Sequence, residues 1–499
     1  MVVGSWVGWS APATYLMKTN QTNLDVTDYG MMIAMYDLGN MVSPIPCGYL
    51  LEHIGRRWTI RIIGPMNMIA WIAIIVWPSK MNVLYMARIF AGLAKGMTMS
   101  SIPMYVGEIA EVKLRGAVLS LFPIMLCVGM LGIQTIGQML SYIQLNILGL
   151  GFSATFTVLF FFMPESPYYL MQKNKRDRAE KSLKTIRAKY DVTDEMELIE
   201  ETITKQMQSK TTYRELFRNK ANRRAFIITA GASMFQRLSG ISPFEKKNAL
   251  TSNAASISEQ DGHAPGDYII ELYISDRTAS SNRSASPNHP KSRMTPESNP
   301  SSSNRQQSKI CPQFIHFTSI TLPSTNYWMK PLAAVVLFTV SKYIGTLSHM
   351  VLVDWMGRKP LMLVSHATMA ALTAAYGISL YALANGPGDH PLAWCPVVVL
   401  WLYGLAYSVG AGSLTYTLIG EMFAANVKTK AAPLCVMFLA GSSFLLDGTY
   451  TKISETFGVY INYYMYAVFN LFWAVVAGFV MIETKGKTFL EIEQMLATT

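Results

Sequence analysis

The stretch LLEHIGRRW, at residues 50–58, recurs in the second part of the chain as LVDWMGRKP, at residues 352–360. Both stretches follow an apolar run and place an acid, a glycine and two adjacent basic residues in the same order. Because glycine accepts the backbone conformations of tight turns, each stretch predicts a short loop between antiparallel helices. A pattern found once in each half indicates a chain built from two related parts.

Two further motifs repeat in the same order. GEIAEVKLR, at residues 107–115, recurs as GEMFAANVK, at residues 420–428, with the same spacing from acid to base. MPES, at residues 163–166, has a counterpart in MIET, at residues 481–484. The three motifs follow the second, fourth and sixth apolar run of each half. Two six-helix halves with a cavity between them are an architecture of alternating-access transporters.

The composition predicts an all-α membrane protein. Of 499 residues, 51% are hydrophobic and only 15% are charged, whereas soluble domains are about a quarter charged. Apolar runs of about 20 residues match the thickness of a bilayer. They predict twelve membrane-spanning helices, near residues 2–17, 29–51, 58–77, 82–106, 116–140, 143–163, 225–243, 328–353, 360–384, 392–423, 431–450 and 459–482.

The net charge of +11 is explained by lysines and arginines in short loops between spans rather than by nucleic-acid binding. The basic loops alternate with acidic or neutral ones, so the positive-inside rule places both termini in the cytoplasm. Asn20, in the triplet NQT, then lies outside, where glycosylation is sterically allowed. The five cysteines show no metal-binding spacing. No nucleophile–base pair, phosphate loop or metal cluster points to an enzyme.

The chain divides into four predicted parts. A first six-helix bundle covers residues 1–163, with a first helix that is short enough to suggest a clipped start. A cytoplasmic helical linker covers 164–224, a second bundle covers 225–482 and a cytoplasmic tail covers 483–499. Residues 244–327 interrupt the second bundle with a segment rich in Ser, Asn and Pro, whose low apolar content predicts disorder.

This segment follows a truncated seventh helix. Replacing the outer half of a membrane helix with polar sequence leaves backbone groups unsatisfied in lipid. Retained intron sequence or a gene-model fault fits the segment better than an evolved loop, and transcript sequencing across it separates these interpretations.

The motifs GYLLEHIGRR, RIFAGLAKG, PMYVGEIAEVKLRG, PESPYYL, FQRLSGIS, VDWMGRK, GEMF and ETKGKTFLEIE resemble those of the sugar porter family of the major facilitator superfamily, and within it the insect facilitated trehalose transporters. The resemblance implies the twelve-helix major facilitator fold, a sugar bound at mid-membrane, no cofactor and no metal. It also implies a monomer in the plasma membrane, with the lipid bilayer as its surroundings. A cytoplasmic latch of ion pairs is implied at Glu52, Arg56, Arg57, Arg88, Glu108, Arg115, Glu165, Asp354, Arg358, Glu421, Lys428 and Glu483.

The sequence departs from the family at the implied sugar site. The candidates for substrate binding are Gln134, Gln138, Gln236, Arg237, Ser242, Lys342, Tyr416 and Ser443. Sugar hydroxyls donate and accept hydrogen bonds, so neutral amide, hydroxyl and aromatic groups suit them. Here Arg237 and Ser242 replace two amide residues of the seventh-helix pattern, Lys342 stands where an asparagine is usual, and Tyr416 stands where a tryptophan is usual.

Arg237, Lys342, Asp37 and Asp447 all lie within apolar runs. An ionised side chain costs about 2.5–3.5 kcal/mol at the centre of a membrane helix, so it faces a cavity or a partner. One interpretation is a central cavity suited to an anionic or zwitterionic solute. Another is internal pairing of the two acids with the two bases, and a third is a decayed site.

Two functions therefore stay open, a facilitative sugar transporter and a non-transporting sensor or defective paralogue. Proton-coupled sugar porters resemble one another in an aspartate on the first helix, and this chain has Ser10 at that position in GWSAP. A uniporter of hexoses or trehalose is the simpler interpretation. Asp37 is the remaining candidate for coupling to protons.

Overall fold

The computed structural model describes residues 1–19, 26–111, 114–137, 139–189, 191–207, 213–241, 331–385, 395–424 and 427–498. Helices are the regular secondary structure throughout these ranges. Several predictions fall outside the described residues: those for Asn20, Gln138, Ser242, the side chain of Asp447 and the segment 244–327.

The first half contains six main helical elements in the described ranges. They are α1 (Val2–Thr19), α2 with α3 (Val26–Val42 and Pro44–His53), α4 (Arg56–Val76), α5 (Met81–Ile109), α6 (Arg115–Ile136) and α7 (Tyr142–Phe161). The second element divides at Ser43, directly before Pro44. Proline lacks the N–H that would continue the helical hydrogen bonds, which accounts for the division.

The second half repeats this arrangement. Its described elements are α12 (Lys220–Leu238), α16 (Pro331–Met356), α17 (Arg358–Asn385), α18 with α19 (Cys395–Val409 and Ala411–Glu421), α20 (Lys428–Phe457) and α21 (Val459–Val480). α18 and α19 are separated by Gly410, whose φ of −124° and ψ of −90° are not helical. Together the two halves confirm the predicted division into twelve elements. Eight spans of the described residues are long and apolar enough to cross a membrane, one of them formed by α18 and α19 together.

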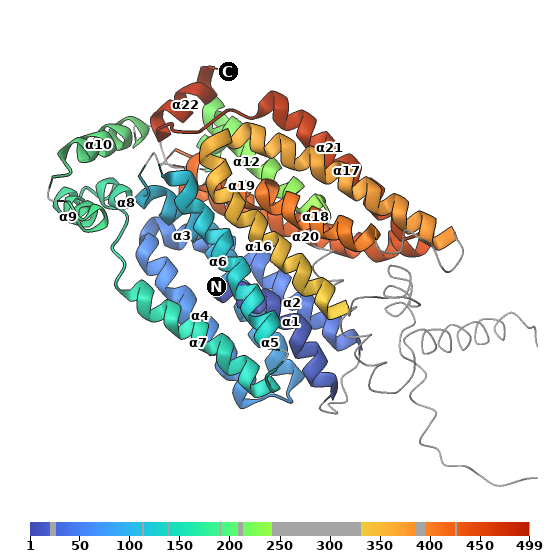
Figure 1. Cartoon of the computed structure of the whole chain (residues 1–499). Coiled ribbons are helices and arrows are strands. Elements are labelled where there is room, and N and C mark those ends of the chain that lie inside the picture. The colour runs from blue at the N-terminus through green and yellow to red at the C-terminus, as the bar shows by residue number, and fades with distance from the viewer. Residues whose placement is uncertain are drawn as a thin grey trace, which may run out of the picture.

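Shorter helices gather at one end of the bundle, which we call the linker face. They are α8 (Pro167–Gln172), α9 (Arg176–Arg187), α10 (Thr193–Met207), α11 (Tyr213–Arg218) and the C-terminal α22 (Phe489–Thr498). Figure 1 shows α8, α9, α10 and α22 at this end, beside the ends of α3 and α12.

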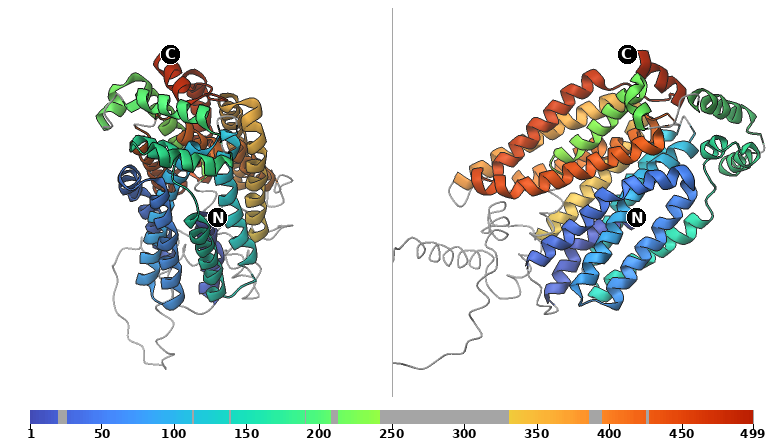
Figure 2. Two further views of the ribbon diagram at one scale, coloured as in Figure 1. Left: turned by 90° about the vertical axis from the view of Figure 1, so that its left-hand side faces the viewer. Right: turned by 180° about the vertical axis from the view of Figure 1, so that it is seen from behind.

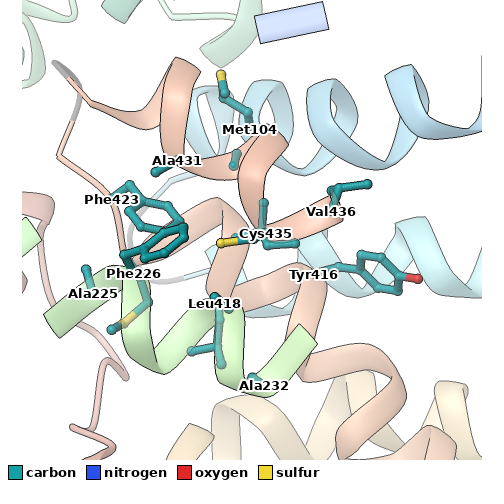
Figure 3. Packing of buried hydrophobic residues seen from close by; sticks show 14 of the residues in the cluster. Met104, Ala225, Phe226, Ala232, Tyr416, Leu418, Phe423, Ala431, Cys435 and Val436 are labelled. Carbon is teal, nitrogen blue, oxygen red and sulfur yellow. The ribbon is translucent and has the colours of Figure 1, made fainter. Parts of the chain in front are cut away.

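The two halves lie against each other along a few helix pairs. α6 packs along α16, α5 packs on α19, and α3 packs on α20; Figure 2 shows the two halves as separate blue and orange groups of helices. One cluster of buried apolar residues runs through both halves, and Figure 3 shows Met104 of the first half beside Cys435 and Val436 of the second. Each half also has a cluster of its own, around Trp71 in the first and around Tyr463 in the second.

Candidate functional site: two repeated charge clusters and their junction

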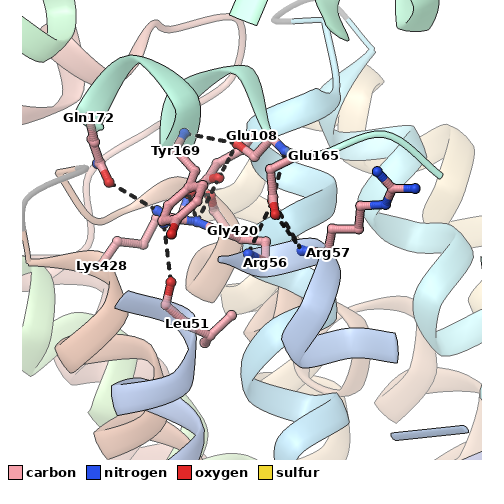
Figure 4. Close-up of polar contacts among 10 residues, drawn as sticks. Leu51, Arg56, Arg57, Glu108, Glu165, Tyr169, Gln172, Gly420 and Lys428 are labelled. Atoms are coloured by element: carbon pink, nitrogen blue, oxygen red, sulfur yellow. Dashed lines mark hydrogen bonds and ion pairs between the residues drawn. The ribbon is translucent and has the colours of Figure 1, made fainter. Parts of the chain in front are cut away.

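The first charge cluster lies at the linker face of the first half, around Arg56 at the start of α4. Its guanidinium donates to both carboxylate oxygens of Glu108 on α5, with Nη2 to Oε1 at 3.0 Å and Nε to Oε2 at 3.1 Å. Both side chains are almost fully buried. A third donor reaches the carbonyl of Leu51, at 3.4 Å, as Figure 4 shows. A buried ion pair offsets the cost of its desolvation only when the remaining donors also find acceptors, and the Leu51 carbonyl supplies one of them.

Glu165 joins the same cluster through the backbone. Its Oε1 accepts hydrogen bonds from the backbone N–H groups of Arg56 at 3.1 Å and Arg57 at 3.0 Å, the first residues of α4. A carboxylate is favourable at the positive end of a helix. Burial raises the pKa of the Glu165 carboxyl, and the hydrogen bonds from Ser166 and Arg57 oppose that rise. Gly55 has a φ of +96°, and a Cβ there would lie 2.5 Å from Glu165 Oε2, so the turn requires glycine.

The second half forms an equivalent cluster. Arg358 donates to Glu421 at 2.8 Å and to the carbonyl of Val353 at 3.1 Å. The carboxylate of Glu483 accepts the backbone N–H groups of Arg358 at 2.9 Å and Lys359 at 3.0 Å. These contacts match those of the first half residue by residue. The repeat seen in the sequence is therefore a repeat of three-dimensional contacts.

Two acids at this face reach the opposite half. Asp354 Oδ2, on α16, accepts the backbone N–H of Ala117 at the start of α6, at 3.1 Å. Glu52, on α3, pairs with Lys430 at the start of α20, at 2.9 Å. Each acid thus lies at the positive end of a helix of the other half. Lys430 was not among the predicted residues, although its place in the motif NVKTK was a signal for it.

Arg115 and Lys428, two of the basic residues of the predicted latch, begin α6 and α20. The structure brings both to one aromatic ring, that of Phe489 in α22. The ring centroid lies 4.1 Å from Cζ of Arg115 and 4.4 Å from Nζ of Lys428. Tyr168 of α8 meets the same ring edge-on. The tail therefore joins the first half, the linker and the second half, and the sequence motifs did not indicate this role for Phe489.

Replacing Phe489 with leucine is expected to loosen α22. Leucine keeps most of the apolar contact but removes two cation–π interactions, which are worth about 0.5–2 kcal/mol each. Amide hydrogen exchange in α22 and α8 of the F489L variant should rise about tenfold. Gln494→Ala changes an exposed side chain of the same helix and should leave exchange unchanged. Equal exchange in F489L and wild type would contradict this role.

Arg88 lies away from both clusters, in contrast to its predicted place in the latch. It is on α5, twenty residues before Glu108 (108 − 88 = 20), which corresponds to about 30 Å of helix. Its buried guanidinium donates to Ser10 Oγ at 3.1 Å and to the carbonyls of Met32 and Trp6, both at 3.3 Å. Arg88 therefore connects α5 to α1 and α2 within the first half.

Asp37 also has a partner that the sequence had not suggested. Its Oδ1 lies 3.4 Å from Nζ of Lys95 on α5, and the two side chains are only 15% and 10% exposed. Lys95 also lies over the ring of Tyr36, 4.5 Å from its centroid. The pairing is within one half, so it connects α2 to α5 rather than one half to the other.

The candidate sugar-binding residues are largely buried, and the described contacts of several of them are with protein. Gln236 Nε2 donates to the carbonyl of Gly412 at 2.8 Å, beside the division between α18 and α19. Gln134 Oε1 accepts from Thr339 of the opposite half at 2.9 Å.

The aromatic and charged candidates lie on the second half. Tyr416 packs edge-on against Phe122 of the first half. Lys342 is buried, with Nζ 5.8 Å from the centroids of the Phe338 and Tyr407 rings. Further candidates on this half are Arg237, which is half-buried on α12, and Ser443, which is buried on α20. Within the described residues, no group of three or more His, Cys, Asp or Glu side chains could hold a metal ion.

The chain is similar to known membrane transporters along most of its length. The family described as "Sugar (and other) transporter" matches residues 10–245 and 315–496. The facilitated trehalose transporter Tret1 of Bombyx mori is 25% identical over 100% of this chain and 85% of its own length. Tret1 of Anopheles gambiae is 24% identical over 99% of this chain, which spans 54% of that longer protein.

Solved structures show the same fold. The major facilitator superfamily proton:xylose symporter XylE bound to 6-bromo-6-deoxy-D-glucose superposes with a TM-score of 0.72 at 18% identity, over 99% of this chain and 97% of the other. The inward-open conformation of XylE superposes less closely, with a TM-score of 0.57 at 17% identity over the same shares of the two chains. The predicted major facilitator fold is thereby confirmed. With its two repeated charge clusters, its twelve elements and a family match over most of its length, the chain belongs to the sugar transporter family of the major facilitator superfamily.

Proposed function

We propose that this protein is a facilitative transporter that moves a neutral sugar, a hexose or trehalose, down its gradient by alternating access. The observation that carries the proposal is the junction at the linker face. Each half has its own buried arginine–glutamate cluster, and the polar and ring contacts described between the halves there include Asp354 with Ala117, Glu52 with Lys430, and Phe489 with Arg115 and Lys428. Each half can therefore move as a unit when these contacts separate.

The linker face is the cytoplasmic gate in this proposal. In the conformation described here the gate is closed, since α5 and α19 touch and the acids of each half reach the helix starts of the other. A transport cycle requires the contacts between halves to break while the clusters within each half persist. The buried pairs Arg56–Glu108 and Arg358–Glu421 suit that second role.

The contacts of Arg88 support uniport rather than proton coupling. Ser10 stands where coupled relatives have an aspartate. Its hydroxyl oxygen accepts a hydrogen bond from the guanidinium of Arg88. A serine does not titrate in the physiological range. Asp37 is titratable, but it is paired with Lys95 within one half.

The test is uptake of radiolabelled glucose and trehalose into proteoliposomes that contain the full chain. We expect saturable uptake of one of these sugars, with equal rates at external pH 5.5 and 7.5 and no effect of a protonophore. An Asp37→Asn variant should transport with the same lack of pH dependence. Uptake that rises with an inward proton gradient would overturn uniport, and no uptake of either sugar by correctly inserted protein would overturn transport of these sugars.

A second candidate function is a sensor that binds without transporting. The observations that favour it are at the implied sugar positions. Gln134 and Gln236 are hydrogen-bonded to Thr339 and to the carbonyl of Gly412, and Lys342 and Arg237 are charged. A sugar that raises the thermal stability of the protein without being taken up would favour this function over transport.

A further inference from the structure

Two arginines share a single acceptor on the outer surface of the first half. Arg57 and Arg61 lie one turn apart at the start of α4, and Nη2 of each donates to the carbonyl oxygen of Phe161 at the end of α7. The Arg57 contact measures 3.2 Å. Since both donors reach one oxygen, the two positive groups lie within a few ångströms of each other.

Neither guanidinium has an ion-pair partner among the residues that the structure describes. The nearest acid of the cluster, Glu165, is occupied by the backbone N–H groups of Arg56, Arg57 and Ser166. A guanidinium carries five N–H donors and suits phosphate oxygens. The carbonyl of Phe161 is neutral and accepts one N–H from each guanidinium. Further N–H donors and both positive charges are therefore available to bind an anion.

The surroundings are those of a lipid-facing surface. Trp58 is 55% exposed, Phe161 is 60% exposed and Phe162 is 76% exposed. The guanidinium of Arg61 lies over the rings of both Trp58 and Phe161, at 4.7 and 4.5 Å from their centroids. α4 starts and α7 ends here, so the site is at the boundary of the membrane span, where headgroup phosphates lie.

The second half provides an internal comparison. Matching Arg56 with Arg358 aligns Arg57 with Lys359 and Arg61 with Leu363. The charge cluster forms equally well in that half, although the uncharged Leu363 stands at the position of Arg61. Arg61 is therefore not needed to build a cluster of this type, and its charge requires another explanation.

From these contacts we propose that Arg57 and Arg61 bind the phosphate of an anionic phospholipid, with its acyl chains along Phe161 and Phe162. The exposed aromatic rings favour a lipid over a free anion, because a soluble phosphate gains nothing from them. Basic pockets between membrane helices are suited to anionic headgroups. The site is separate from the transport pathway, so the proposal does not depend on the proposed function.

The experiment measures lipid retention by native mass spectrometry of the full chain in detergent, with phosphatidylglycerol, phosphatidylcholine or inorganic phosphate added. Wild type should retain phosphatidylglycerol in preference to phosphatidylcholine. The Arg61→Leu variant, which carries the residue of the second half, should bind it about fivefold more weakly, the effect expected for one basic residue at an anionic surface. Arg61→Lys should recover part of the binding.

The matched control is Lys359→Leu, which removes one positive charge at the equivalent of Arg57 in the other half. It should leave retention of phosphatidylglycerol within twofold of wild type. Equal losses in R61L and K359L would show a general charge effect and overturn the site. Unchanged binding in R61L, or displacement of the lipid by millimolar inorganic phosphate, would overturn it as well.

Discussion

The Gly107→Ala variant is expected to shift the protein away from the conformation in which the linker face is closed. Gly107 on α5 and Gly420 on α19 touch through their backbones across the two halves. A Cβ on Gly107 would lie 2.5 Å from the carbonyl oxygen of Gly420 and 3.1 Å from its carbonyl carbon. Because these atoms are backbone, the two helices must separate, at a cost of about 1–3 kcal/mol that falls only on the closed conformation.

A spin-label distance between α3 and α20 measures this shift, since these helices pack together at the linker face. We expect the short distance to lose population by about tenfold in G107A, and sugar uptake to fall with it. The control is Gly151→Ala on α7, where a Cβ would meet nothing within 4 Å. That variant should stabilise its helix slightly and leave the distance unchanged. An unchanged distance in G107A would show that the glycine contact does not hold the gate closed.

The Arg358→Gln variant is expected to lose about 3–5 kcal/mol of stability, the cost of leaving one partner of a buried ion pair uncompensated. Glu421 is 2% exposed, and its carboxylate receives two hydrogen bonds from Arg358. The hydroxyl of Thr484, at 3.0 Å, cannot replace a positive charge. Asp354, which also pairs with Arg358, would lose its contact within the second half.

Unfolding of the purified protein in detergent by a denaturant titration measures this loss. The double variant with Glu421→Gln should recover part of it, because the buried charge is then removed. Arg176→Gln breaks the exposed pair with Glu200 and should cost under about 1 kcal/mol. If R358Q and R176Q were equally destabilised, the buried cluster would not be a source of stability.

Much of the linker face could be predicted from the sequence because its residues lie in short, repeated motifs. Arg56 and Arg358 follow the glycine of a turn between two helices, and Glu108 and Glu421 follow the glycine of a GE pair. The partners themselves are far apart in the chain, 52 positions for Arg56 with Glu108 and 63 for Arg358 with Glu421, but each motif lies at a helix end, and antiparallel helices bring these ends to one face. The repeated motifs therefore indicate which residues gather at this face, and helix packing decides how they pair.

The contacts at mid-membrane were not predictable in the same way. The sequence pattern pairs Asp37 with Lys342 or Arg237, whereas its neighbour in the structure is Lys95. The motif around Arg88 places it in the latch, whereas in the structure it contacts α1 and α2. The partner of a charge on a long helix depends on the rotation of that helix against its neighbours, and no local pattern records that rotation.

The sequence alone thus determined the twelve elements, the duplication and the residues of the two charge clusters, because apolar length and turn motifs are properties of the chain read in order. Only the tertiary structure decided that Gly107 meets Gly420, that Phe489 lies between Arg115 and Lys428, and that Arg57 and Arg61 share the carbonyl of Phe161. These contacts join segments far apart in the chain. They arise from how whole helices pack, which is set by the sum of many weak contacts rather than by any one stretch.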